Sequence, residues 1–302
     1  MHKILVLAIL SGPAWGGWVE KYRSGEALLD ERRSAIALER LQVAAKEAEA
    51  EGASKAQLAA VYDALGRAAM GSGQYRDGKL YFERALRLAA DGPVEAQAAV
   101  TSNLGQACQA LGQVVRAEQH FRQALAVMPN RAALLNQLGG VLYLQHRYEE
   151  AEEAFRKALL YAGVLDSATA LSDLAVIYEA RGKLREAAGL YEQAVSSTPA
   201  GHARARMLAN LGALRLRLGK PADAVVALGR SLEEIEIAVG PVHPDVAHVL
   251  EIYERALSKA GHKAQAIDVA HAPMPSGLRS PHRTTRPEPS WTISTLNNAR
   301  SS

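Results

Sequence analysis

Apolar residues recur with a helical period along most of the chain, most clearly in residues 168–199. Two stripes with spacings of three and four residues predict a pair of helices, since such positions share one helix face. The stripes are Leu171, Leu174, Ala175 and Tyr178, followed by Ala187, Tyr191 and Ala194. Gly182 lies in the break between them, and Pro199 ends the second helix because proline lacks the amide proton and clashes with the preceding turn. We expect Ala175 and Ala187 where the two helix axes come close.

The same helix pair recurs at a nearly constant interval. A small residue marks the first helix of successive units, at Gly66, Gly105, Gly139, Ala175 and Gly212, and these markers are 39, 34, 36 and 37 residues apart. A fixed period of this length is the sequence signature of a repeat array. We therefore expect about six to seven units over residues 18–272, of which the first and the last are degenerate.

The order of residue types within a unit resembles the tetratricopeptide repeat, with a leucine, a small residue and a tyrosine in the first helix, then an alanine, an aromatic residue and a proline. A longer last interval around His243, Pro244 and Asp245 resembles the extended repeats of kinesin light chain and of many bacterial tetratricopeptide proteins. The resemblance covers about residues 18–272. It implies an all-α, right-handed α-solenoid of antiparallel helix pairs, with twelve to fourteen helices, because each unit buries its apolar face only against its neighbours.

Residues 1–17 differ from the repeats. Lys3 precedes an apolar run from Ile4 to Leu10, and small residues follow up to Ala14. A charged start, a short apolar core and a small-residue exit are typical of a secretory signal with cleavage near Ala14. The alternative is an apolar N-terminal arm packed on the first unit. The signal predicts a secreted or periplasmic protein, and the arm predicts a cytoplasmic one.

Residues 273–302 are rich in proline, serine, threonine and arginine and show no apolar period. We expect a disordered tail, either functional or acquired through an altered reading frame. Pro273 halts the last helix, which begins at Ala264 and is too short to cover apolar residues such as Ile267. The end of the array is therefore expected to stay partly open and to allow weak self-association.

Charge and composition exclude several classes of function. The chain has 35 basic and 32 acidic residues, and the segment after residue 272 holds four arginines and one glutamate, which leaves 31 of each sign before it. A neutral array argues against nucleic-acid binding, which needs clustered positive charge. No apolar run reaches the length of a membrane span. The single cysteine, Cys108, excludes an internal disulfide.

No arrangement of side chains predicts catalysis, so we expect no enzymatic activity, no cofactor and no metal. Cys108 lies on an apolar helix stripe with no histidine at a helical spacing, which indicates a packed thiol. His243 and Asp245 flank Pro244, an arrangement that suits the start of a helix. The acidic cluster at residues 149–153 begins a helix, where the helix dipole and solvation explain it.

In tetratricopeptide arrays the first helices line a concave groove, and side chains beside the leucine and the small residue project into it. Carried over by position, this implies groove residues Asp63, Arg67, Ser102, Asn103, Gln106, Asn136, Gln137, Tyr143, Ser172, Asp173, Arg206 and Asn210. Asparagine and glutamine offer both a donor and an acceptor, which suits the main chain of an extended peptide. The other interpretation is a solvated face of ordinary polar residues. The family's carboxylate clamp needs several basic residues in the first units, and Arg67 alone does not form one.

These observations favour a non-enzymatic scaffold that binds an extended peptide or a partner helix in the groove. The alternative is a peptide-sensing regulatory protein that acts through a change in solenoid shape, but such sensors usually carry an output domain, and no stretch of this sequence predicts one. An enzyme with a site built across helices is disfavoured, because no acid, base and nucleophile converge.

Overall fold

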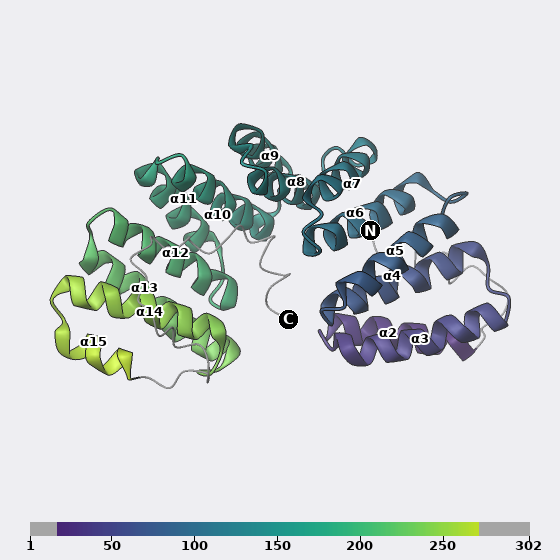
Figure 1. Ribbon diagram of the computed structural model, residues 1–302, viewed down its shortest axis with the longest axis horizontal. Coiled ribbons are helices and arrows are strands. Elements are labelled where there is room, and N and C mark those ends of the chain that lie inside the picture. The colour runs from purple at the N-terminus through teal and green to yellow at the C-terminus, as the bar shows by residue number, and fades with distance from the viewer. Residues whose placement is uncertain (1–16, 272–302) are drawn as a thin grey trace. The chain divides into compact units, whose positions relative to one another are not determined.

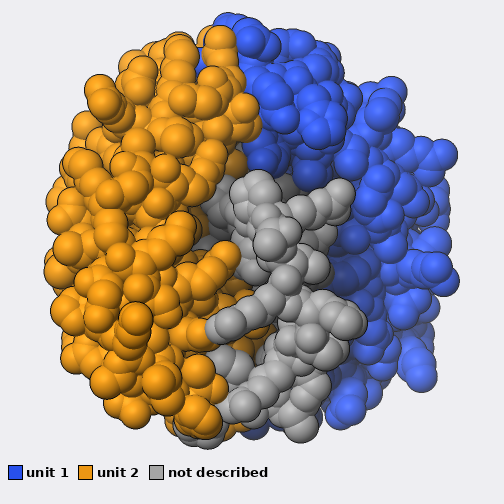
Figure 2. All heavy atoms as spheres, turned by 60° about the vertical axis from the view of Figure 1, so that its left-hand side comes forward, with its two compact units in different colours: residues 1–154, 295–302 blue, residues 155–294 orange. Residues whose placement is uncertain are grey.

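The computed structural model describes residues 17–271, and these form fourteen α-helices and no strand (Figure 1). The helices follow one another in pairs, which confirms the expected all-α solenoid. The chain divides into two compact units, whose described parts are residues 17–154 and 155–271 (Figure 2). The tail expected over residues 273–302 lies outside the described residues. So does the expected signal or arm at the N-terminus, except for Gly17, which begins the first helix.

Unit 1 contains four helix pairs. Their first helices are α2 (Gly17–Asp30), α4 (Lys55–Gly71), α6 (Val94–Ala110) and α8 (Ala132–Leu144). Their second helices are α3 (Ser34–Ala50), α5 (Tyr75–Leu88), α7 (Val114–Val127) and α9 (Tyr148–Tyr161), and the unit boundary falls inside α9. Consecutive first helices touch one another from α2 to α8. Polar side chains from neighbouring repeats can therefore meet along this row of first helices.

Unit 2 contains three further pairs. They are α10 (Val164–Ala180) with α11 (Leu184–Ser197), α12 (His202–Arg217) with α13 (Pro221–Val239), and α14 (Pro244–Ala260) with α15 (Lys263–Ala270). The last helix has only 8 residues, in agreement with the short final helix predicted from the sequence. Ala266 is buried, but Ile267 is 58% exposed, so apolar surface remains uncovered at this end.

The small residue of each first helix allows the two helices of a pair to approach closely. A Cβ atom added to Gly66 would lie 2.4 Å from a ring carbon of Phe82, and one added to Gly105 would lie 2.7 Å from a ring carbon of Phe121. The same kind of contact joins Gly25 to Leu41 and Gly212 to Leu228. A side chain at these glycines would overlap the partner helix, so the periodic small residue is a packing requirement. Ala187, expected at such a contact, is fully buried.

The turn between the helices of a pair uses a residue in the left-handed conformation. Glycine supplies it in five pairs, at Gly73, Gly112, Gly182, Gly219 and Gly261, where φ lies between 71° and 88°. Arg32 and His146 take this place in the first and fourth pairs, with φ of 59° and 60°. Such a conformation is uncommon for residues other than glycine. His146 is held in it by a contact of 2.9 Å between its Nδ1 and the hydroxyl of Tyr148.

The helix starts singled out in the sequence are confirmed. Pro244 stands in the first turn of α14, and the His243 side chain accepts a hydrogen bond from the backbone N–H of Asp245 at 3.1 Å. The acidic cluster begins α9, with Glu149 and Glu150 in its first turn. Both arrangements satisfy or complement the free N–H groups at a helix N-terminus.

Candidate functional site

All twelve candidate groove residues lie on first helices. Asp63 and Arg67 are on α4, Ser102, Asn103 and Gln106 on α6, Asn136, Gln137 and Tyr143 on α8, Ser172 and Asp173 on α10, and Arg206 and Asn210 on α12. None of them is an exposed residue: six are buried and six are half-buried. In unit 1 the first helices are in contact, so their polar side chains cover one another. We call the polar surface that α2, α4, α6 and α8 form together the first-helix face of unit 1.

Charged side chains bind each other at the α2–α4 part of this face. The Arg67 guanidinium donates to Glu26 Oε1 at 2.5 Å and to Asp63 Oδ2 at 3.1 Å. The amide of Asn103 on α6 donates to Asp63 Oδ1 at 2.7 Å. Burial would lower the pKa of Arg67, but the carboxylates of Asp63 and Glu26 outweigh burial and raise it. Arg67, Asp63 and Asn103 thus hold three successive first helices together.

Between α6 and α8 the polar groups are amides and hydroxyls. Ser102 Oγ donates to Gln137 Oε1 across a long 3.5 Å contact. Asn136, the preceding residue on α8, is only 4% exposed, and no group in the described residues donates a hydrogen bond to its Oδ1. A buried acceptor without a donor costs about 1 to 3 kcal/mol. The α6–α8 part of the face therefore holds a buried acceptor whose hydrogen-bonding capacity the described residues leave unused.

Tyr143 forms an aromatic edge at the C-terminal end of α8. Its ring centroid lies 5.7 Å from that of Tyr148, at an angle of 50°, and the Tyr148 ring also contacts His146. Both tyrosines are half-buried. Asn136 and Tyr143 are seven residues apart, so they lie on the same side of α8 at a separation of two turns. One side of α8 therefore carries both a buried amide acceptor and an aromatic ring.

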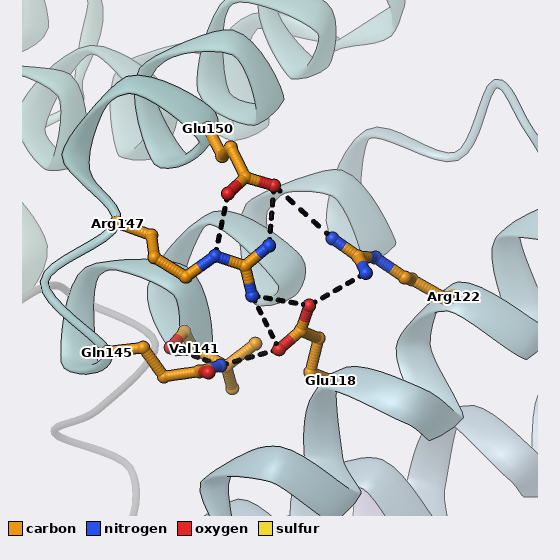
Figure 3. Close-up of polar contacts among 6 residues, drawn as sticks. All are labelled: Glu118, Arg122, Val141, Gln145, Arg147 and Glu150. Atoms are coloured by element: carbon orange, nitrogen blue, oxygen red, sulfur yellow. Dashed lines mark hydrogen bonds and ion pairs between the residues drawn. The ribbon is translucent and has the colours of Figure 1, made fainter.

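A second charged network fixes the corner between α7, α8 and α9 (Figure 3). Glu118 on α7 accepts hydrogen bonds from Arg147 at 2.8 and 3.0 Å and from Gln145 at 2.7 Å. Arg147 also donates to Glu150 at 2.5 and 2.6 Å, and Arg122 contacts both carboxylates. Burial would raise the pKa of Glu118, but these donors lower it. Glu150, assigned from the sequence to helix-dipole and solvation effects, therefore also binds two arginines.

The first helices of unit 2 also carry charged groups that contact one another. His202 Nε2 on α12 lies 2.7 Å from Asp245 Oδ2 on α14. Burial would raise the pKa of Asp245, but the hydrogen bond with His202 and the neighbouring His243 and Arg206 lower it. Burial lowers the pKa of Arg206, against the opposing effect of Asp245 and Asp173. The polar side chains in this part of unit 2 are charged, whereas those between α6 and α8 are neutral.

Sequence reasoning did not single out Tyr22 and Glu26, which complete the charged network on α2. Both stand at the same offsets from the small residue of their unit as Asp63 and Arg67 do, so extending the repeat alignment to the degenerate first unit would have found them. His202 had no such signal, and Asp245 was singled out only as part of a helix start. The interval between their units is longer, which removes the fixed offset.

The remaining candidates for chemistry are structural. Cys108 is fully buried, and burial raises the pKa of its thiol, so it is a packed side chain. Across residues 17–271, no three histidine, cysteine, aspartate or glutamate side chains are grouped in a way that could hold a metal ion. In the same part of the chain no helix has the length and apolar composition of a membrane span.

Family models described as tetratricopeptide repeat match residues 130–199 in one case and residues 64–126 and 172–236 in the other. No curated protein matches the sequence. Among solved structures, a chain of the APC/C hetero-tetramer Cut9-Hcn1 has a TM-score of 0.62 and 16% identity, with 80% of this chain and 42% of that chain covered. This chain therefore spans less than half the length of that relative.

Two further structures are similar over most of their own length. A tetratricopeptide repeat protein from Parabacteroides merdae has a TM-score of 0.59 and 16% identity, and the match covers 94% of this chain and 98% of that one. PilF from Pseudomonas aeruginosa has a TM-score of 0.57 and 20% identity, with 71% and 90% covered. At these identities the likeness is one of fold. The two family models together match more than half of the chain, and on that ground it belongs to the tetratricopeptide repeat family.

Proposed function

We propose that this protein is a non-enzymatic scaffold that binds an extended peptide segment along the first-helix face of unit 1. The tetratricopeptide repeat fold supports a role in protein–protein interaction in general, and the family is typically non-catalytic. The choice of face and the choice of an extended segment rest on the polar groups of α6 and α8.

The Asn136 side chain carries the proposal. Its Oδ1 is buried without a donor from the described residues, on a helix face that contains further amides. Natural proteins seldom keep such an acceptor, because its desolvation is not repaid within the fold. A main-chain N–H group of a bound peptide would supply the missing hydrogen bond once a rotation of the Asn136 amide exposes Oδ1. The cost in the free chain would then be recovered on binding.

The neighbouring amides suit the same ligand. Gln106 and Gln137 are half-buried, and each offers a donor and an acceptor. An extended peptide presents alternating N–H and C=O groups, which amide side chains can bind whatever the peptide's sequence. The networks around Arg67 and Glu118 hold the helices on both sides of this region. Such a preformed surface loses little conformational entropy when it binds.

The test begins with a selection of peptides from a random library displayed on phage, with the full chain as the target. Enriched peptides are then measured by fluorescence polarisation against the wild type and against Asn136→Leu. Leucine keeps the size of the side chain and removes its acceptor, so we expect affinity to fall about 10-fold. Asn136 is a sharper choice than Asn103, whose amide already binds Asp63.

Gln119→Leu is the matched control, because Gln119 is an exposed amide on the second helix α7. It should leave affinity unchanged. Circular dichroism should show equal helix content in both variants and the wild type. Equal affinity of the wild type and Asn136→Leu for every enriched peptide, or the absence of any enriched peptide, would contradict the proposal.

A further inference from the structure

The helices α6 and α8 are almost free of charge. The 17 residues of α6, VEAQAAVTSNLGQACQA, contain Glu95 as their single charged side chain, and the 13 residues of α8, AALLNQLGGVLYL, contain none. Their partner helices carry more charge: α7 contains two arginines and a glutamate, and α9 contains four glutamates, an arginine and a lysine. The neutrality is therefore specific to the first helices of these two repeats and does not reflect the composition of the whole region.

Charged side chains that flank the first-helix face of this neutral segment are bound by partners in the protein. On one side, Asp63 accepts from both Arg67 and Asn103. On the other side, Glu118 accepts from Arg147 and Gln145. The charge of each carboxylate is therefore already balanced by an arginine of the protein. A charged ligand group placed against α6 and α8 would lose its water, and the two helices themselves offer it only the charge of Glu95.

The neutral segment also offers one aromatic surface. Tyr143 is half-buried, and its ring packs against Tyr148 at 5.7 Å. This edge lies on the same side of α8 as the buried acceptor of Asn136. An apolar or aromatic side chain of a peptide held by its main chain at Asn136 could bury surface here.

We propose that α6 and α8 act as a specificity segment, which accepts an uncharged extended stretch of another protein and rejects charged ones. The inference rests on the proposed function and adds the chemistry of the partner. The stretch contributes main-chain N–H and C=O groups to the amides of α6 and α8, and an apolar or aromatic residue to the Tyr143 edge. Selectivity arises because only an uncharged stretch avoids the desolvation of an unpaired charge.

The experiment uses the composition of the peptides enriched from the phage library. The stretch needed for binding, defined by truncation, should lack Asp, Glu, Lys and Arg and should contain an apolar or aromatic residue. Placing Asp or Lys in the centre of that stretch should weaken binding about 10-fold or more. Affinity should change little between about 0.05 and 0.5 M salt, because no charge pair is screened.

A charge added to the protein itself also tests the preference for uncharged peptides. Gln106→Glu keeps the shape of the side chain and adds a carboxylate to α6. It should weaken the neutral peptides and shift a repeated selection toward peptides with Lys or Arg. Gln119→Glu, the same change on the exposed face of α7, should do neither.

The outcomes separate this inference from the proposed function. Enriched peptides that are acidic or basic, bind more weakly at high salt and still lose affinity in Asn136→Leu would overturn the specificity while peptide binding to the face stands. Peptides whose affinity is the same for the wild type, Asn136→Leu and Gln106→Glu would contradict both the specificity and the proposed function. Neutral peptides that bind more weakly to both variants would support the specificity and the proposed function.

Discussion

The charged pair of first helices α2 and α4 and the neutral pair α6 and α8 are built on one packing scheme but use their polar side chains differently. In both pairs a glycine of a first helix lies against a large side chain of the second helix, as Gly66 does against Phe82 and Gly105 against Phe121. The polar side chains of the two pairs differ. On α4, Arg67 binds two carboxylates, whereas on α8 the Oδ1 atom of Asn136 has no donor among the described residues.

This difference shows which positions the fold constrains. The contact between glycine and aromatic ring determines how closely two helices pack, so it recurs in both segments. The polar positions next to it are constrained only by the need to satisfy buried groups. In α2 and α4 charged side chains bind one another, as Arg67 does with Asp63 and Glu26. The amides of α6 and α8 meet that need incompletely, which makes them the better candidates for binding.

The largest expected loss of stability comes from breaking the charged segment. Arg67→Met should lower the free energy of unfolding by about 2 to 3 kcal/mol, because it leaves the Asp63 and Glu26 carboxylates buried without their cation. The figure is at the lower end for buried pairs, since the Arg67 side chain is 28% exposed. Urea unfolding followed by circular dichroism measures the change. A loss below about 0.5 kcal/mol would show that this network is not a structural one.

The shared packing scheme predicts equal effects in the two segments. Gly66→Leu and Gly105→Leu should each cost about 1 to 3 kcal/mol, since the new side chain overlaps Phe82 or Phe121. Ala187→Leu should cost a similar amount in unit 2, because Ala187 is fully buried. Thermal unfolding of the three variants provides the comparison. An unchanged melting temperature in any of them would contradict the repeat alignment at that position.

Acid should act on the charged contacts and leave the amides unaffected. The pKa of Glu118 is lower in the folded chain than its usual value, so its contribution to stability is present above about pH 4.3 and is lost as the pH falls through the folded-state value. Glu118→Gln should cost about 1 to 2 kcal/mol at pH 7. The difference from wild type should shrink below about pH 4. A constant difference from pH 7 to pH 3 would contradict the assigned ion pairs.

The smallest expected effect has the opposite sign. Asn136→Leu should leave stability unchanged or raise it by up to about 1 kcal/mol, because it removes a buried acceptor that lacks a donor. The same variant is expected to bind peptides more weakly. Asn103→Leu provides the contrast, since it breaks a hydrogen bond of 2.7 Å to Asp63 and should be destabilising. A clear loss of stability in Asn136→Leu would indicate that its amide is structural.

Much of the fold was accessible from the sequence because helix pairing depends on local periodicity. The interval between Gly66, Gly105 and Gly212 predicted the repeats, and the structure places each of these glycines against a large residue of its partner helix. The start of α14 at Pro244 and the short final helix were predicted for the same reason. All of these features depend on residues that are close in the sequence.

The state of the polar side chains on the first helices was not accessible in this way. Asp63 and Asn103 were expected beside an open groove, yet they bind one another across 40 residues of chain. The Arg67 contact with Glu26 spans 41 residues, and the Ser102 contact with Gln137 spans 35. Burial and hydrogen bonding of these groups depend on which first helices become neighbours. A periodic pattern places a side chain on a helix face, but contacts between repeats decide whether its polar atoms are satisfied there or left for a ligand.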